Sequence, residues 1–175
     1  RLLYSNITED FFQVPSLYYD DQLKRLWIGT GSAGLFYYDI IRKSLSDIPI
    51  RNFPKQPILA IRKDAKNTLL IGIDGQGIWN ISEKGDTILH IYKEDLNNPF
   101  SLRGDGVYDI LCDGSKNWIA TFTGKLSFFE NNNSQITPVT YQINNPNSLG
   151  NNYVNQIIED HEGHIWFATN NGVSR

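Results

Sequence analysis

Four aspartates are the first residues in this sequence whose type could do chemistry, because carboxylates act as general acids and bases. They are Asp20, Asp64, Asp113 and Asp160. Each follows a pair of aliphatic residues spaced three apart and comes just before a turn. An aspartate that recurs at the same place before several turns is typical of a side chain that accepts backbone N–H hydrogen bonds. The pattern therefore favours a structural role over acid–base catalysis.

The second candidate is the segment Asp160-His161-Glu162-Gly163-His164, where two histidines three residues apart lie beside acidic residues. Histidine and carboxylate side chains at such a spacing can hold a metal ion. The corresponding turns elsewhere in the chain have no histidine, which favours a solvated turn here. With three histidines and one cysteine in the whole chain, no nucleophile–base set can be assembled. We therefore expect no catalytic residues, no metal and no cofactor.

The charge of the chain excludes one class of partner. Its 175 residues include 16 Lys and Arg against 19 Asp and Glu, a formal net charge of −3, which gives no basic surface for nucleic acid.

A single cysteine, Cys112, excludes a disulfide framework. No stretch approaches the roughly 18 apolar residues that span a bilayer, so we expect no membrane-spanning helix in these 175 residues.

The positions that could do chemistry belong to a sequence repeat. Its best marker is a large apolar residue followed by Ile or Phe and then a small residue, and these anchors are Trp27, Leu70, Trp118 and Trp166. The anchors are 43, 48 and 48 residues apart. Six or seven residues after each anchor comes a glycine, at Gly34, Gly77, Gly124 or Gly172. Because several positions recur in phase, we interpret the chain as four copies of one structural unit.

Each unit is built from short β-strands, since segments rich in Val, Ile, Trp, Phe, Tyr and Thr alternate with clusters of Gly, Asn and Asp. In the third unit the expected strands are Val107–Asp113, Asn117–Thr121, Lys125–Glu130 and Ile136–Ile143. The second strand of each unit is apolar on both faces, which predicts a sheet that is covered on both sides. Four-stranded antiparallel sheets that repeat every ~40–50 residues are typical of β-propeller blades, whereas a β-sandwich has no reason to repeat at this period.

The sequence thus predicts an all-β fold, a β-propeller fragment of about four four-stranded antiparallel blades. The expected blades are residues 1–50, which include an N-terminal strand segment, then 51–100, 101–148 and the partial blade 149–175, together one partial propeller domain. We expect Trp27, Trp118 and Trp166 to pack between neighbouring blades. An aromatic residue that stacks on a ligand should instead occur once, in a loop.

The last two units begin with a shared phrase, Asn98-Pro99-Phe100-Ser101-Leu102 and Asn145-Pro146-Asn147-Ser148-Leu149. The second copy continues with Glu159-Asp160, Gly163, Ile165–Thr169 and Asn171-Gly172-Val173. With these residues the chain resembles the two-component regulator propeller repeat. The resemblance implies the periplasmic sensor region of a hybrid two-component system of Bacteroidetes, whose parent chain would be a membrane-anchored histidine kinase that controls glycan utilisation. It implies no catalytic residues in this chain.

A propeller presents a ring of loops at one end of its channel, where the second strand turns into the third and the fourth leads to the next blade. In these loops planar polar side chains lie near aromatic ones, a combination that suits the hydroxyls and C–H faces of sugars. The candidate ligand-binding residues are Arg51, Phe53, Asp74, Gln76, Phe100, Arg103, Phe122, Asn170 and Asn171. We expect a sensor that binds an oligosaccharide or another small periplasmic ligand. The alternatives are a propeller enzyme, such as a metal-dependent polysaccharide lyase, and a pure protein-interaction scaffold.

The two ends of such a fragment predict a further property. An arc of four blades exposes the apolar faces of its first and last blades. Two arcs could close into an eight-bladed homodimer, with blade four of each chain against blade one of the other. Leu2-Leu3-Tyr4 could supply the outer strand that the fourth blade lacks. A closed four-bladed monomer is the alternative.

Overall fold

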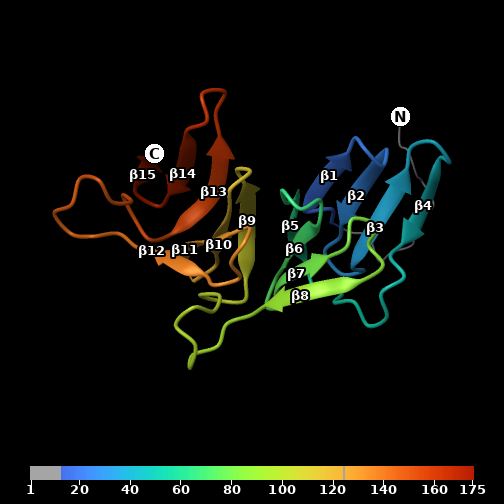
Figure 1. Cartoon of the computed structure of the whole chain (residues 1–175), viewed down its shortest axis with the longest axis horizontal. Helices are drawn as coiled ribbons and strands as arrows, with labels where there is room; N and C mark the ends of the chain where they lie inside the picture. Colours follow the sequence, from blue (N-terminus) through green and yellow to red (C-terminus); the bar gives the residue numbers. More distant parts are fainter. Residues whose placement is uncertain (1–12, 124) are drawn as a thin grey trace.

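The computed structural model describes residues 13–123 and 125–175, and these contain fifteen β-strands and no helix. The strands form four antiparallel sheets, which we call blades 1 to 4 (Figure 1). Blade 1 contains β1 (Ser16–Asp20), β2 (Arg25–Gly29), β3 (Leu35–Asp39) and β4 (Ser44–Asp47). Blade 2 contains β5 (Ile58–Lys63), β6 (Leu69–Ile73), β7 (Gly77–Ile81) and β8 (Ile88–Tyr92). Blade 3 contains β9 (Val107–Cys112), β10 (Lys116–Thr121), β11 (Lys125–Glu130) and β12 (Thr137–Val139). Blade 4 contains β13 (Val154–Glu159), β14 (Ile165–Thr169) and β15 (Gly172–Ser174).

Each blade is a meander in which consecutive strands pair, as expected for short β-rich segments joined by tight turns. The fold class is confirmed: the chain is a propeller fragment of three four-stranded blades and one with three described strands. In the third unit β9, β10 and β11 lie within one residue of the predicted strands. The fourth strand is shorter than predicted, because β12 ends at Val139 and polar residues follow it. The predicted strand Leu2-Leu3-Tyr4 and the anchor Gly124 lie outside the described residues.

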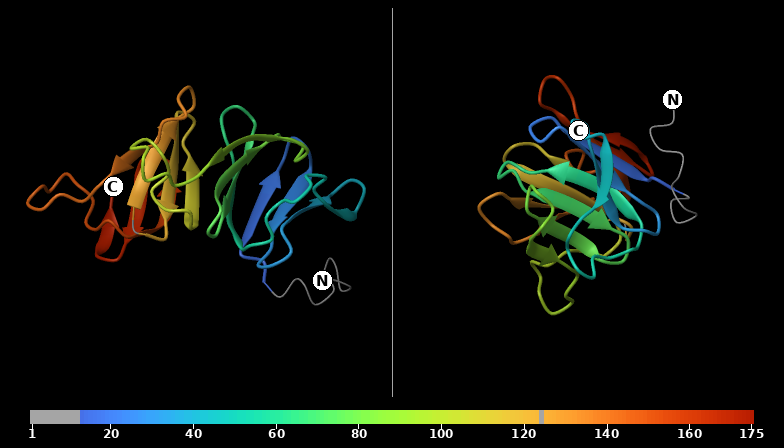
Figure 2. Two further views of the ribbon diagram at one scale, coloured as in Figure 1. Left: turned by 90° about the horizontal axis from the view of Figure 1, so that it is seen from below. Right: turned by 90° about the vertical axis from the view of Figure 1, so that its right-hand side faces the viewer.

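The blades stack face to face in sequence order. The first strands of successive blades contact one another, β1 with β5, β5 with β9 and β9 with β13, and so line the inner side of the stack. Blade 1 and blade 4 lie at opposite ends of the molecule in Figures 1 and 2. The described blades therefore form an open arc here. Each interface is filled by its own hydrophobic core.

Three hydrophobic clusters occupy the three interfaces. The repeat anchor of each blade points toward the following blade: Trp27 and Leu70 are completely buried there, and Trp118 packs with its ring 5.4 Å from that of Phe167 in blade 4. Trp166 occupies the same position on the free face of blade 4 and is half-buried. Full burial of a leucine side chain such as that of Leu70 is worth about 1.5–3 kcal/mol, so the packing between blades stabilises the arc.

A small residue on the second strand of each blade receives a branched side chain from the next blade. A Cβ added to Gly29 would lie 2.7 Å from Ile58 Cγ2, and one added to Gly72 would lie 2.8 Å from Val107 Cγ1. At the third interface Ala120 is the small residue, and it shares a buried cluster with Val154. We call the branched residue the knob and the small residue the hole.

Polar contacts also tie the inner strands together. Asp109 of β9 accepts a hydrogen bond from Arg62 Nη2 of β5 at 3.1 Å and another from the backbone N–H of Ile157 of β13 at 2.9 Å. At the first interface Lys63 Nζ lies 3.1 Å from Asp20 Oδ2, where the Asp20 side chain is buried and that of Lys63 is 9% exposed. Because the partners come from different blades, these bonds set how far one blade slides along the next.

The described residues contain no helix that could cross a membrane.

Candidate functional site

The loops predicted to bind ligand lie on one face of the arc, which we call the loop face. Strand pairing is antiparallel, so the end of each second strand and the start of each first strand come together. In blades 2, 3 and 4 the turn after the second strand donates a backbone N–H to the residue just before the first strand. These bonds run from Asp74 to Pro57 at 2.9 Å, from Phe122 to Gly106 at 2.7 Å and from Asn170 to Tyr153 at 3.1 Å. Gly31 and Gln13 make the corresponding bond in blade 1 at 3.0 Å.

The structure brings two predicted residues together above Gly106, where blades 2 and 3 meet. A Cβ added to Gly106 would lie 3.0 Å from Phe122 Cβ and 3.2 Å from Asp74 Oδ1. The Phe122 ring stacks on Tyr108 with 4.9 Å between centroids and 28° between planes. Phe122 is 60% exposed and Tyr108 is 36% exposed, so the stacked pair forms an aromatic surface open to solvent beside a carboxylate. We call Asp74, Tyr108 and Phe122 the aromatic site.

Tyr108 was missed by the sequence analysis. The register between β9 and β10 shifts here, with Val107 opposite Thr121 and Asp109 opposite Ala120, so Tyr108 is the extra residue of a β-bulge. The corresponding residues in the other units are Pro15, Leu59 and Asn155. An aromatic side chain that occurs once at a repeated position was the signal that could have found it.

The remaining polar candidates on the loop face are held by local contacts. Gln76 Oε1 accepts a hydrogen bond from Lys93 Nζ at 3.1 Å. Arg103 donates from Nη2 to Pro99 O at 2.6 Å. At blade 4, Asn170 Oδ1 accepts from Asn155 Nδ2 at 2.9 Å, and Asn171 Nδ2 donates to Gly150 O at 3.3 Å. These residues line the face in separate groups rather than converging on the aromatic site.

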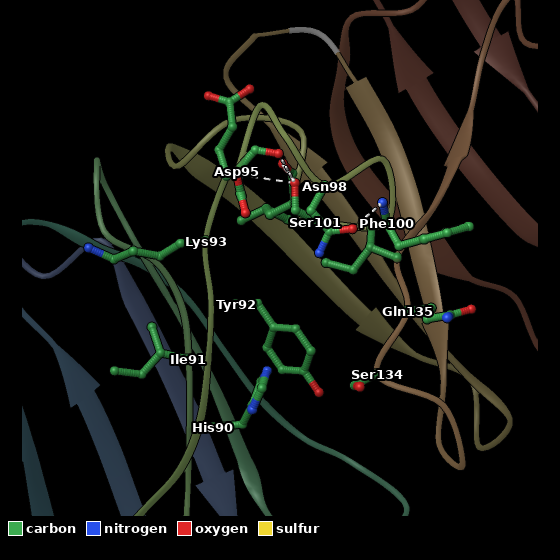
Figure 3. A pocket seen from close by; sticks show the side chains of 13 residues that line it. His90, Ile91, Tyr92, Lys93, Asp95, Asn98, Phe100, Ser101, Ser134 and Gln135 are labelled. Atoms are coloured by element: carbon green, nitrogen blue, oxygen red, sulfur yellow. Dashed lines mark hydrogen bonds between the residues drawn. The ribbon is translucent and has the colours of Figure 1, made fainter.

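Three candidates from the connectors between blades have other surroundings. Phe53 packs edge-on against Trp79, with 5.2 Å between ring centroids, as part of the core between blades 1 and 2. Arg51 is exposed on the same connector. Phe100 is 51% exposed and borders a cavity of about 380 Å³ at the rim of the arc (Figure 3).

The cavity in Figure 3 lies between β8, the connector to β9 and the turn before β12. Its wall includes Tyr92, whose ring lies 4.4 Å from that of His90 and 4.7 Å from that of Phe129. A second cavity of about 380 Å³ borders the corresponding connector between blades 3 and 4, including Asn147 and Leu149. Two cavities at equivalent places indicate that the shape of the connector produces them.

The aspartates before the turns have the structural role that their repetition predicted. Oδ1 of Asp160 accepts the backbone N–H groups of Glu162 and His164, both at 2.9 Å. Asp20, Asp64 and Asp113 each accept two backbone N–H groups of their own turns in the same way. Oδ2 of Asp160 also accepts the indole N–H of Trp166 at 2.7 Å. This indole bond, with the bond from the His164 N–H, lowers the pKa of Asp160 to about 2, so its carboxyl is ionised at neutral pH and cannot act as a general acid.

The other reactive side chains have surroundings that do not favour catalysis. His164 Nδ1 lies 3.3 Å from Asp160 Oδ2 and 3.5 Å from Glu162 Oε2, whereas His161 is exposed on the same turn. Among residues 13–123 and 125–175, no three His, Cys, Asp or Glu side chains form a group that could hold a metal ion. Burial raises the pKa of the Cys112 thiol to about 12, so it is protonated at neutral pH and is a poor nucleophile.

Comparison with known families gives a match in the fourth blade. Residues 148–171 match the family described as the two component regulator propeller. This chain contains a two-component regulator propeller repeat. The matched segment of the regulator propeller repeat runs from the end of the connector before β13 to the turn after β14. A search of the curated proteins finds no match to the sequence.

Solved structures share the fold at low sequence identity. The extracellular domain of the putative hybrid two component system BT3049 from B. thetaiotaomicron is 19% identical with a TM-score of 0.71, over 97% of this chain and 23% of that one. The extracellular domain of the putative hybrid two component system BT4673 from the same organism is 17% identical with a TM-score of 0.57, over 98% and 29%. The computationally designed Ika4 protein is 11% identical with a TM-score of 0.65, over 93% and 89%. The chain thus spans about a quarter of the two-component structures that it matches.

The regulator propeller repeat consists largely of residues with structural contacts. Ser148, where the match begins, bonds through Oγ to both the N–H and the C=O of Gln142, at 3.1 and 3.2 Å. Ser101 makes the same pair of bonds to Asp95 at 3.0 and 2.9 Å, so the shared phrase closes the connector in the same way before blades 3 and 4. The positions that recur build the blades, and the aromatic site consists of side chains that do not recur.

Proposed function

We propose that this chain is part of the sensor propeller of an extracytoplasmic, periplasmic region of a hybrid two-component system that regulates glycan utilisation. We further propose that the aromatic site binds an oligosaccharide. The observation that carries this proposal is the stacked pair of Phe122 and Tyr108, open to solvent beside the Asp74 carboxylate. In the parent chain a membrane-anchored histidine kinase would receive the signal.

The chemistry of the aromatic site supports a sugar as its ligand. The exposed face of an aromatic ring packs against the C–H face of a pyranose, which removes apolar surface from water. A carboxylate at the edge of the ring accepts hydrogen bonds from two neighbouring hydroxyls, and charged acceptors make the stronger bonds. Gly106 leaves room for this approach, because a side chain there would contact both Phe122 and Asp74.

The setting is supported by the regulator propeller repeat and by the fold. The two structures from B. thetaiotaomicron are extracellular domains of putative hybrid two component systems, and residues 148–171 match the two component regulator propeller. The sequences of loops on a rigid scaffold can vary without loss of the fold. This variability fits a sensor that must recognise one glycan among many.

The test is calorimetry of this chain against a panel of neutral and acidic oligosaccharides. We expect heat of binding for a member of the panel, lost in Phe122→Ala and retained in Phe100→Ala, a matched removal of an exposed ring away from the site. If no oligosaccharide binds, the interaction-scaffold alternative replaces the proposal. If binding needs an added divalent metal and is lost in His164→Ala, the metal-dependent enzyme alternative replaces it.

A further inference from the structure

The carboxylate of the aromatic site has no cation as its partner. Among residues 13–123 and 125–175, no ion pair involves Asp74. Lys93 and Arg103, on the connector between blades 2 and 3, hydrogen-bond to Gln76 and to a backbone carbonyl instead. Lys125 begins β11 in the hairpin that carries Phe122, and it is exposed. The aromatic site therefore holds a negative charge that no described side chain neutralises by contact.

The carboxylate and the open ring approach the same point in space. Asp74 Oδ1 lies 3.2 Å and Phe122 Cγ, where the ring begins, 3.8 Å from the position that a Cβ on Gly106 would take. The backbone of Gly106 does not have a positive φ, so another residue could adopt its conformation. The missing side chain at Gly106 thus leaves space, and that space lets Asp74 lie beside the ring.

The stacked pair makes the ring a good neighbour for positive charge. Tyr108 covers part of the Phe122 ring, and the rest of that ring is open to solvent. The face of an aromatic ring is the negative part of its quadrupole and attracts cations. A carboxylate makes its strongest hydrogen bonds to charged donors such as an ammonium group. Ring and carboxylate together therefore favour a cationic group over a neutral one.

We propose that the oligosaccharide at the aromatic site carries a free amine, with its ammonium group between the Asp74 carboxylate and the Phe122 ring. This inference rests on the proposed function, because it names the class of sugar that the same site prefers. The pyranose of an amino sugar supplies the C–H face that stacks on the ring, and its ammonium group supplies the charge. A uronic acid or a sulfated sugar would instead bring a second anion beside Asp74, and like charges repel each other.

Calorimetry with two matched ligands tests the proposal. Oligomers of glucosamine and of N-acetylglucosamine share their backbone and linkage, and acetylation removes the positive charge. We expect the glucosamine oligomer to bind about tenfold more tightly at low salt. This preference should shrink as salt rises toward ~0.5 M, because salt screens the exposed Asp74 charge.

The same titrations separate failure of this inference from failure of the proposed function. Equal affinity for the two oligomers, with both lost in Phe122→Ala, would overturn the preference for an amine and leave the oligosaccharide site standing. Binding of neither oligomer would count against both. Spermidine carries amines without a sugar ring and should bind much more weakly than the glucosamine oligomer; equal binding would overturn the proposal, because charge alone would then suffice.

Two variants test whether the preference comes from Asp74. Asp74→Asn removes the charge at nearly constant size and should abolish the preference for the free amine. Glu94→Gln is the matched control, since it removes an exposed carboxylate that borders the rim cavity, and it should keep the preference. Far-ultraviolet circular dichroism checks that each variant is folded. A folded Asp74→Asn protein that still prefers the glucosamine oligomer, or an equal loss in Glu94→Gln, would contradict the proposal.

Discussion

At the scale of single residues, the same side chains recur because the blades need the same contacts. The indole of Trp118 packs 5.1 Å from Phe128 and 5.4 Å from Phe167, and its N–H donates to Asp113 Oδ2 at 2.8 Å. Trp166 repeats the hydrogen bond at the end of the arc. Neither ring lies in a loop, in contrast to that of Phe122.

Removal of the Trp118 ring should therefore lower stability. Trp118→Ala leaves a cavity between blades 3 and 4 and should reduce the free energy of unfolding by about 3 kcal/mol, measured by urea denaturation. Trp118→Phe keeps the packing and loses only the hydrogen bond to Asp113, so it should cost about 1 kcal/mol. If Trp118→Ala kept its stability but abolished oligosaccharide binding, Trp118 would be a ligand residue.

The pKa of Asp160 gives a second prediction at this scale. The bond from Trp166, with the bond from the His164 N–H, holds the pKa at about 2, below the ordinary value of 3.8. Its contribution to stability is therefore complete above pH ~4 and is lost as the pH falls toward 2. A carboxyl carbon titration by NMR should give a midpoint of about 2, which Trp166→Phe raises toward 3.8 and Trp118→Phe leaves unchanged. A midpoint near 3.8 in the wild-type protein would contradict this account.

At the scale of elements, the knob and the hole set the spacing between blades. Gly72→Leu should lower the free energy of unfolding by about 1–3 kcal/mol, because the new side chain meets Val107 inside a packed interface. The matched control is Ala168→Leu in blade 4, where no described blade covers the position; it should cost much less. Equal losses from the two variants would show that the hole is not what limits the approach of the next blade.

The repeat predicts the elements well and the aromatic site only in part. Turn aspartates and strand anchors recur because backbone geometry recurs, so one sequence shows them four times. Tyr108 comes from a β-bulge whose register is fixed only by pairing with β10. Phe53 is an aromatic residue in a connector, as expected of a side chain that stacks on a ligand. Its ring instead packs against Trp79, at the core between blades 1 and 2. Sequence proximity could not show which loop residues meet across two blades.

At the scale of the whole molecule, Asp109 links three blades through one carboxylate. Asp109→Ala leaves the guanidinium of Arg62 and the buried N–H of Ile157 without this partner, and it should lower the free energy of unfolding by about 2–3 kcal/mol. Asp109→Asn keeps an acceptor and should lose less, with both variants measured by urea denaturation. Equal stability of Asp109→Ala and the wild type would mean that core packing alone sets the stacking of the blades.

Mapping of amide chemical shifts decides whether the loop face between blades 2 and 3 binds an oligosaccharide. The ¹⁵N-labelled protein is titrated with the oligosaccharide panel used for calorimetry. We expect the largest shifts on the amides of Asp74, Gly106 and Phe122, and Phe122→Ala should remove them. No shift with any member of the panel, or shifts confined to the rim cavity around His90 and Ser134, would contradict it.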